Sequence, residues 1–122
     1  MQQYGAQAYQ QTAKTVESPR ERESALLIKA AASLQNVRDE WPSELTQLTT
    51  ALAFNRKLWT ILMTSVTRED SALPQDVRQN VANLGIYILN ETREMLLSPT
   101  NPGKLDALIN INRQLAAGLR GN

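Results

Sequence analysis

The chain has 122 residues, with 13 basic and 12 acidic side chains but neither histidine nor cysteine, and this length predicts a single domain over residues 1–122. The missing residue types exclude disulfides, thiolate nucleophiles, imidazole bases and the usual zinc ligands. The balanced charges argue against direct nucleic-acid binding, and no segment has the length and apolarity of a signal peptide or a membrane span, so we expect a cytoplasmic protein without cofactors.

The N-terminal part of the chain predicts an arm followed by a long helix. Residues 1–17 are rich in Gln and Ala and indicate an N-terminal arm or short helix. Ser18 can accept a hydrogen bond from the first free amides of a helix, Pro19 suits the first helical position, and Glu21 completes a capping box. Pro42 ends this helix, after an apolar stripe at alternating spacings of three and four: Leu27, Ala30, Leu34, Val37 and Trp41.

Three further amphipathic helices are predicted. Ser43 can cap the second, which has the inward stripe Leu45, Leu48, Leu52, Asn55, Trp59, Leu62 and Val66. Pro74 opens the third, in which Gly85, a close-approach residue, accompanies the stripe Val77, Val81, Leu84, Ile88 and Met95. After a loop at 98–103, the last carries Leu105, Leu108, Asn112, Leu115 and Leu119. Because no segment alternates as a strand would, the fold class is an all-α antiparallel bundle of four main helices.

Two asparagines, Asn55 and Asn112, occupy positions where this helical pattern calls for an apolar residue. The structural interpretation is that they form a buried pair, because two carboxamides can hydrogen-bond each other and thereby set the register of the helices. A buried amide left unpaired would cost about 1 to 3 kcal/mol. The functional alternative is that one asparagine offers its amide to the backbone of a bound partner.

Three segments resemble conserved blocks of the FlaF family, the bacterial flagellar biosynthesis regulators: ALAFNRKLWTIL, SALPQDVRQNVANLGIYIL and ALININRQLAAGL. In that family an Asn-x-x-Leu-Trp motif precedes a Leu-Pro-led helix with an Ile-Gly or Leu-Gly step, and a terminal Ile-Asn-Arg leads to a Gly-Leu. The matching positions are Asn55, Leu58, Trp59, Leu73, Pro74, Gly85, Ile111, Asn112, Arg113, Gly118 and Leu119. The stretch AYQQTAKTVESPRERESALL resembles the N-terminal block of the family.

This resemblance implies a flagellar biogenesis protein that binds flagellin in the cytoplasm as a secretion chaperone and promotes flagellin synthesis and export. It also implies FlbT, the translational regulator of flagellin, as a second partner. The alternative is a post-transcriptional regulator, or a scaffold, that acts on flagellin expression through a protein partner such as FlbT. Direct contact with RNA is disfavoured by the balanced charge.

The sequence predicts no enzyme and no metal site. Carboxylate pairs such as Glu21 and Glu23, or Glu91 and Glu94, lie among basic neighbours on polar helix faces, where they are expected to be solvated charges. Acidic residues at helix ends lack the ligand spacing of a calcium loop. The glycines are scattered and form no phosphate-binding loop.

The more informative signal is a second apolar stripe in two of the helices, beside the inward ones. The second helix has Ala51, Phe54, Leu58 and Ile61 and the third has Ala82, Ile86 and Leu89. One interpretation is that both helices are central and each packs against two neighbours. The other is an exposed groove for an amphipathic partner helix, since flagellin is expected to present helical terminal segments that are apolar on one face. The candidate partner-binding residues are Phe54, Leu58, Ile61, Ile86 and Leu89.

Overall fold

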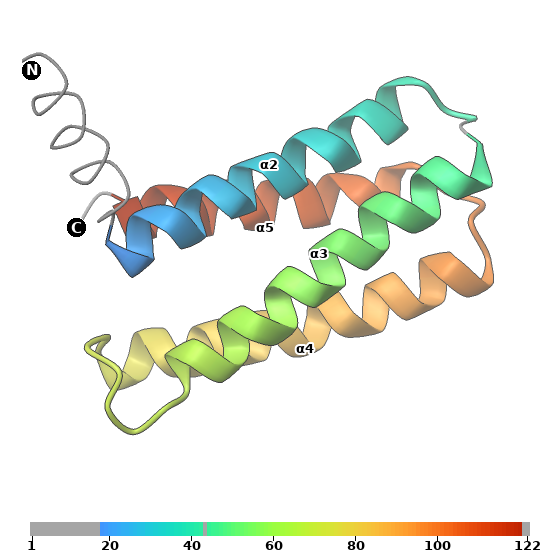
Figure 1. Cartoon of the computed structure of the whole chain (residues 1–122). Helices are drawn as coiled ribbons and strands as arrows, with labels where there is room; N and C mark the ends of the chain where they lie inside the picture. Colours follow the sequence, from blue (N-terminus) through green and yellow to red (C-terminus); the bar gives the residue numbers. More distant parts are fainter. Residues whose placement is uncertain (1–17, 43, 121–122) are drawn as a thin grey trace, which may run out of the picture.

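The computed structural model describes residues 18–42 and 44–120, and this part of the chain forms four α-helices without a strand. The helices are α2 (Pro19–Asp39), α3 (Leu45–Val66), α4 (Gln75–Leu97) and α5 (Gly103–Arg120), shown in Figure 1. The all-α bundle is confirmed. No helix in the described ranges is long and apolar enough to cross a bilayer. The expected arm over residues 1–17 and the expected Ser43 cap lie outside the described residues.

The helix ends follow local sequence signals closely. Ser18 Oγ accepts a hydrogen bond of 3.1 Å from the Glu21 amide, and Pro19 is the first residue of α2, as predicted. The connection after α2 contains a cis peptide bond before Pro42. At α5 the structure differs from the prediction, because this helix already begins at Gly103, where the Asn101 side chain accepts a hydrogen bond of 2.8 Å from the Gly103 amide.

The helices pack in the order α2, α3, α4, α5 around the bundle, so that α3 and α5 face each other across its diagonal. Figure 1 shows α2 lying beside α5 and α3 lying beside α4. Contact is most extensive between α2 and α5 and least extensive between α4 and α5. Ser24 Oγ donates a hydrogen bond of 2.8 Å to the backbone carbonyl of Ala116, which requires small side chains where α2 and α5 meet.

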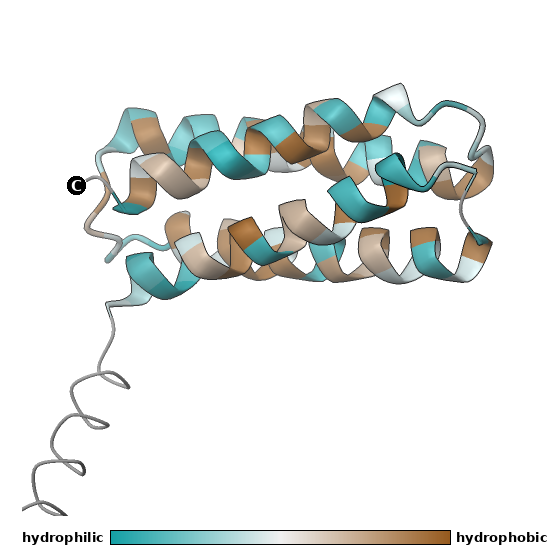
Figure 2. Cartoon of the chain, turned by 90° about the horizontal axis from the view of Figure 1, so that it is seen from above, coloured by the Kyte–Doolittle hydropathy of each residue, from teal (hydrophilic) through white to brown (hydrophobic). Residues whose placement is uncertain are grey.

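The core consists mainly of the predicted apolar stripes, and Figure 2 shows hydrophobic and hydrophilic positions alternating along the helices. Trp59 is fully buried, whereas Trp41 is half-buried. Leu45 was expected in the core, but it lies outside it: Leu45 is the first residue of α3 and its side chain is 61% exposed. Gly85 marks a close approach of α3 and α4, because a Cβ at this position would lie 2.1 Å from Sδ of Met63.

Candidate functional site

A surface groove of about 620 Å³ runs between α2 and α3. Its apolar lining comes from Val37 on α2 and from Ala51 and Phe54 on α3. The remaining lining residues are polar or charged: Lys29, Ser33, Asn36, Glu40, Thr46, Gln47 and Thr50. An apolar floor with a polar rim is the form of a groove that accepts one face of an amphipathic helix.

The groove exists because Phe54 lies on the flank of α3 that faces α2. The ring is only partly buried, and Lys29 Nζ on α2 lies 5.8 Å from its centroid, a cation–π contact. Ile61 lies seven residues further along α3, which returns to nearly the same flank at about 100° per residue. Its side chain is 58% exposed, so the apolar strip continues from the groove towards the end of α3.

The five candidate partner-binding residues divide between two flanks of the α3–α4 pair. Phe54 faces α2, while Met63 faces Gly85 of α4; the two positions are nine residues apart, which places them on opposite sides of α3 at about 100° per residue. Ile86 and Leu89 on α4 therefore do not extend the groove, and neither residue lines it. Ile86 is 55% exposed and Leu89 is half-buried.

Leu58 differs from the other four candidates because it is part of the packed interior. Its side chain is 7% exposed and belongs to the core cluster. For this position the structure supports the first interpretation of the second stripe, in which α3 is a central helix that packs against two neighbours. Leu58 is therefore a core residue and not a surface contact for a partner.

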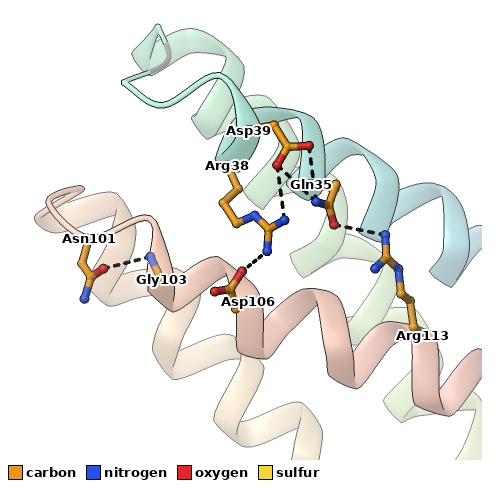
Figure 3. A network of polar contacts seen from close by, with 7 residues as sticks. All are labelled: Gln35, Arg38, Asp39, Asn101, Gly103, Asp106 and Arg113. Carbon is orange, nitrogen blue, oxygen red and sulfur yellow. Dashed lines mark hydrogen bonds and ion pairs between the residues drawn. The ribbon is translucent and has the colours of Figure 1, made fainter.

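The groove wall formed by α2 is held from its opposite side by a polar network with α5 (Figure 3). Arg38, in the last turn of α2, forms ion pairs with Asp106 of α5 and with Asp39. The hydrogen bond to Asp106, and after it that to Asp39, raises the pKa of the Arg38 guanidinium above its ordinary value. Gln35 also accepts a hydrogen bond of 3.1 Å from Arg113 of α5. These contacts fix the rotation of α2, so that its other flank faces the groove.

A buried polar chain crosses the diagonal of the bundle from α3 to α5. Asn112 Nδ2 donates a hydrogen bond of 2.7 Å to Asn55 Oδ1, and Trp59 Nε1 donates one of 2.8 Å to Asn112 Oδ1. All three residues are fully buried. Asn112 thus connects two residues of α3 that lie one turn apart, which fixes the register of α5 against α3.

The direct contact of Asn55 with Asn112 was expected from the sequence, but the role of Trp59 was missed. The signal was present, since a buried indole N–H normally needs an acceptor, and Trp59 follows Asn55 by one helical turn. The pair is also not reciprocal: Asn55 Nδ2 has no hydrogen-bond partner among the described residues. Asn112 therefore satisfies two groups on α3, while Asn55 satisfies one on α5.

The polar residues contributed by α2 to the groove were likewise missed. Lys29, Ser33, Asn36 and Glu40 recur at spacings of three and four, which places them on one helical flank. A polar flank on a helix is ordinarily read as a solvated face. Only the pairing of this flank with Phe54 of α3 distinguishes it as one wall of a groove.

Comparison with known proteins gives one family match. The family model described as "Flagellar protein FlaF" matches residues 5–119, which is nearly the whole chain. The match includes the groove, the buried polar chain and the network between α2 and α5. No curated protein and no solved structure matches the chain.

Proposed function

The chain belongs to the family of the flagellar protein FlaF, and on this premise we propose that it binds flagellin in the cytoplasm as a secretion chaperone. A helical terminal segment of flagellin would lay its apolar face into the groove between α2 and α3. Covering that face keeps the flagellin subunit from polymerising before export. By keeping subunits competent for export, the protein would promote flagellin production.

The observation that supports this proposal is the apolar strip formed by Phe54 in the groove and the exposed Ile61 beyond it. The two residues are seven positions apart on one flank of α3, a distance of about 10 Å along the helix axis. This spacing matches the repeat of apolar residues on an amphipathic partner helix. The neighbouring polar rim would face the polar side of the same helix.

The test compares two exposed isoleucines on opposite flanks. Ile61→Glu places a charge beside the groove, and Ile86→Glu makes the same change at a side chain of similar exposure on α4, 58% against 55%. Burying an unpaired charge against an apolar helix costs several kcal/mol, and about 2.7 kcal/mol corresponds to a hundredfold loss of affinity. We therefore expect Ile61→Glu to weaken flagellin binding at least about tenfold, while Ile86→Glu leaves it nearly unchanged.

Binding should be measured by calorimetric titration of purified monomeric flagellin, with nuclease-treated components and with thermal melting recorded on the same samples. Because both isoleucines are exposed, both variants should melt like the wild-type protein. Absence of flagellin binding by the wild-type chain would refute the chaperone function and favour a regulator that acts through another protein. If the two variants lose flagellin affinity equally, or if neither variant loses it, flagellin binds a different surface.

A further inference from the structure

The groove between α2 and α3 has opposite charges at its two ends. At one end Lys29 lies over the ring of Phe54. At the other end Glu40 caps the C-terminus of α2 and faces the first turn of α3, where Thr46 also lines the groove. Because α2 rises about 1.5 Å per residue, the eleven positions between the two charges correspond to about 16 Å.

Neither charge is neutralised by a neighbour within the described ranges. No ion pair in residues 18–42 and 44–120 involves Lys29, Glu40 or the adjacent Glu44. The other charges at the end of α2, Arg38 and Asp39, bind each other, and Arg38 also binds Asp106. Lys29, Glu40 and Glu44 are all exposed and remain available to an incoming partner.

These charges can also select a direction for a bound helix. The N-terminus of a helix carries a partial positive charge and its C-terminus a partial negative charge. Glu40 lines one end of the groove, where Glu44 is the N-cap residue of α3, and the ammonium of Lys29 lies at the other end. A partner helix is therefore favoured with its N-terminus beside Glu40 and its C-terminus beside Lys29, which makes it antiparallel to α2.

We propose that the groove between α2 and α3 binds an amphipathic helix in this one direction, with a basic side chain near the N-terminus of that helix and an acidic one about eleven residues later. The proposal rests on the proposed function, because it takes a helical segment of flagellin as the natural occupant. It goes further by assigning Lys29 and Glu40 the role of reading the charge order of the partner. The apolar floor provides affinity, and the two end charges determine the direction of the bound helix.

Two synthetic amphipathic peptides of identical composition test the proposal. Both carry the same apolar stripe and one lysine and one glutamate eleven positions apart; in the forward peptide the lysine comes first, and in the reverse peptide the glutamate comes first. An exposed ion pair contributes about 0.2 to 1 kcal/mol. The reverse peptide can form both ion pairs only in the opposite direction, in which each terminus of the peptide helix lies beside a charge of the same sign as its own partial charge. Because a favourable charge beside a helix terminus contributes about 0.3 to 1 kcal/mol, we expect the reverse peptide to bind about three- to thirtyfold more weakly than the forward peptide.

The matched variant of the full-length chain exchanges the charges of the groove itself. Lys29→Glu combined with Glu40→Lys keeps the net charge of the protein unchanged and alters two exposed side chains. In this variant the forward peptide should bind in the opposite direction, with its N-terminus at the position-29 end of the groove. A nitroxide label on the first residue of the peptide, read by the broadening of nearby amide resonances, reports the direction of binding in both proteins. In wild-type protein the preference should shrink in about 1 M salt, where the screening length is about 3 Å.

Three results overturn the proposal: failure of both peptides to bind, equal affinity of the two peptides for the wild-type chain, or a forward peptide whose labelled end stays at the same end of the groove after the charge exchange. Two further measurements test other occupants of the groove. A dimer that blocks peptide binding, detected by sedimentation, would assign the groove to a second copy of the chain. A gain of peptide affinity on Tyr9→Glu, a change within the N-terminal segment 1–17, would assign the groove to that segment, and either result overturns the proposal. Flagellin titration separates the two claims. Flagellin that binds the wild-type chain, together with a labelled peptide that shows no fixed direction, refutes the directional claim but leaves the chaperone function intact.

Discussion

Replacing Asn112 by leucine should destabilise the fold far more than the same replacement of Asn55. Leucine has the branching of asparagine but no hydrogen-bonding group, so the shape changes little at either position. In the Asn112→Leu variant the buried Trp59 Nε1 loses its acceptor and Asn55 Oδ1 loses its donor. Each unpaired buried group costs about 1 to 3 kcal/mol, so the expected loss is about 2 to 6 kcal/mol.

The Asn55→Leu variant has a different balance. It leaves Asn112 Nδ2 without its acceptor, but it also removes Asn55 Nδ2, which has no partner in the described structure. The bond from Trp59 to Asn112 persists. One unpaired group replaces another, so the net change in the free energy of unfolding should be close to zero. Since both variants exchange Asn for Leu at fully buried positions, their difference of at least about 2 kcal/mol reports the hydrogen bonds.

Urea unfolding followed by far-ultraviolet circular dichroism measures both variants. The midpoint should fall strongly for Asn112→Leu and little for Asn55→Leu, with an unchanged dependence on urea concentration. An Asn112→Leu chain that is unfolded in water while Asn55→Leu remains folded would be the extreme of the same result. Adding Asn55→Leu to Asn112→Leu should restore about 2 to 6 kcal/mol, because both the unpaired carbonyl and the unpaired amide of Asn55 are removed. Equal losses in the two single variants would refute the reasoning.

Three further predictions concern stability. Gly85→Ala should destabilise the wild-type protein, because the added Cβ would overlap Met63. In a Met63→Ala background the same change should stabilise the protein by about 1 kcal/mol, because alanine has the higher helix propensity. Urea unfolding of the wild type, the two single variants and the double variant tests for this change of sign. Ser18→Ala should cost about 1 kcal/mol through loss of the cap to Glu21, and an unchanged urea midpoint would contradict that. The melting temperature should stay constant between about pH 6 and 9, because the chain has no histidine or cysteine and only the α-amino group titrates there. Folding raises the pKa of Arg38 through its contacts with Asp106 and Asp39. These contacts therefore stabilise the fold at every pH below the pKa of Arg38 in the unfolded chain, and the stabilisation is lost only in strong alkali. A change of the melting temperature above about 5 °C between pH 6 and 9, measured by scanning fluorimetry, would contradict this account.

Much of the fold follows from local information in the sequence. The apolar spacing predicted four amphipathic helices, and the Ser18–Pro19 signal placed the start of α2 at the residue where the structure has it. Such signals are readable because helix periodicity and capping depend on residues within a few positions of each other. One boundary differs from the prediction: the loop expected through Gly103 ends earlier, because α5 begins at Gly103, whose amide donates a hydrogen bond to the Asn101 side chain.

The tertiary structure decided which surfaces those helices share. The sequence indicates that Phe54 and Ile86 lie outside the inward stripes, but their separation onto opposite flanks depends on α2 packing beside one side of α3 and α4 beside the other. The order of helices around a bundle follows from contacts between residues distant in the chain, which a local pattern does not encode. For the same reason the sequence suggested a symmetric pair of asparagines, while the packed structure made Asn112 the acceptor for Trp59 and left one amide of Asn55 unpaired.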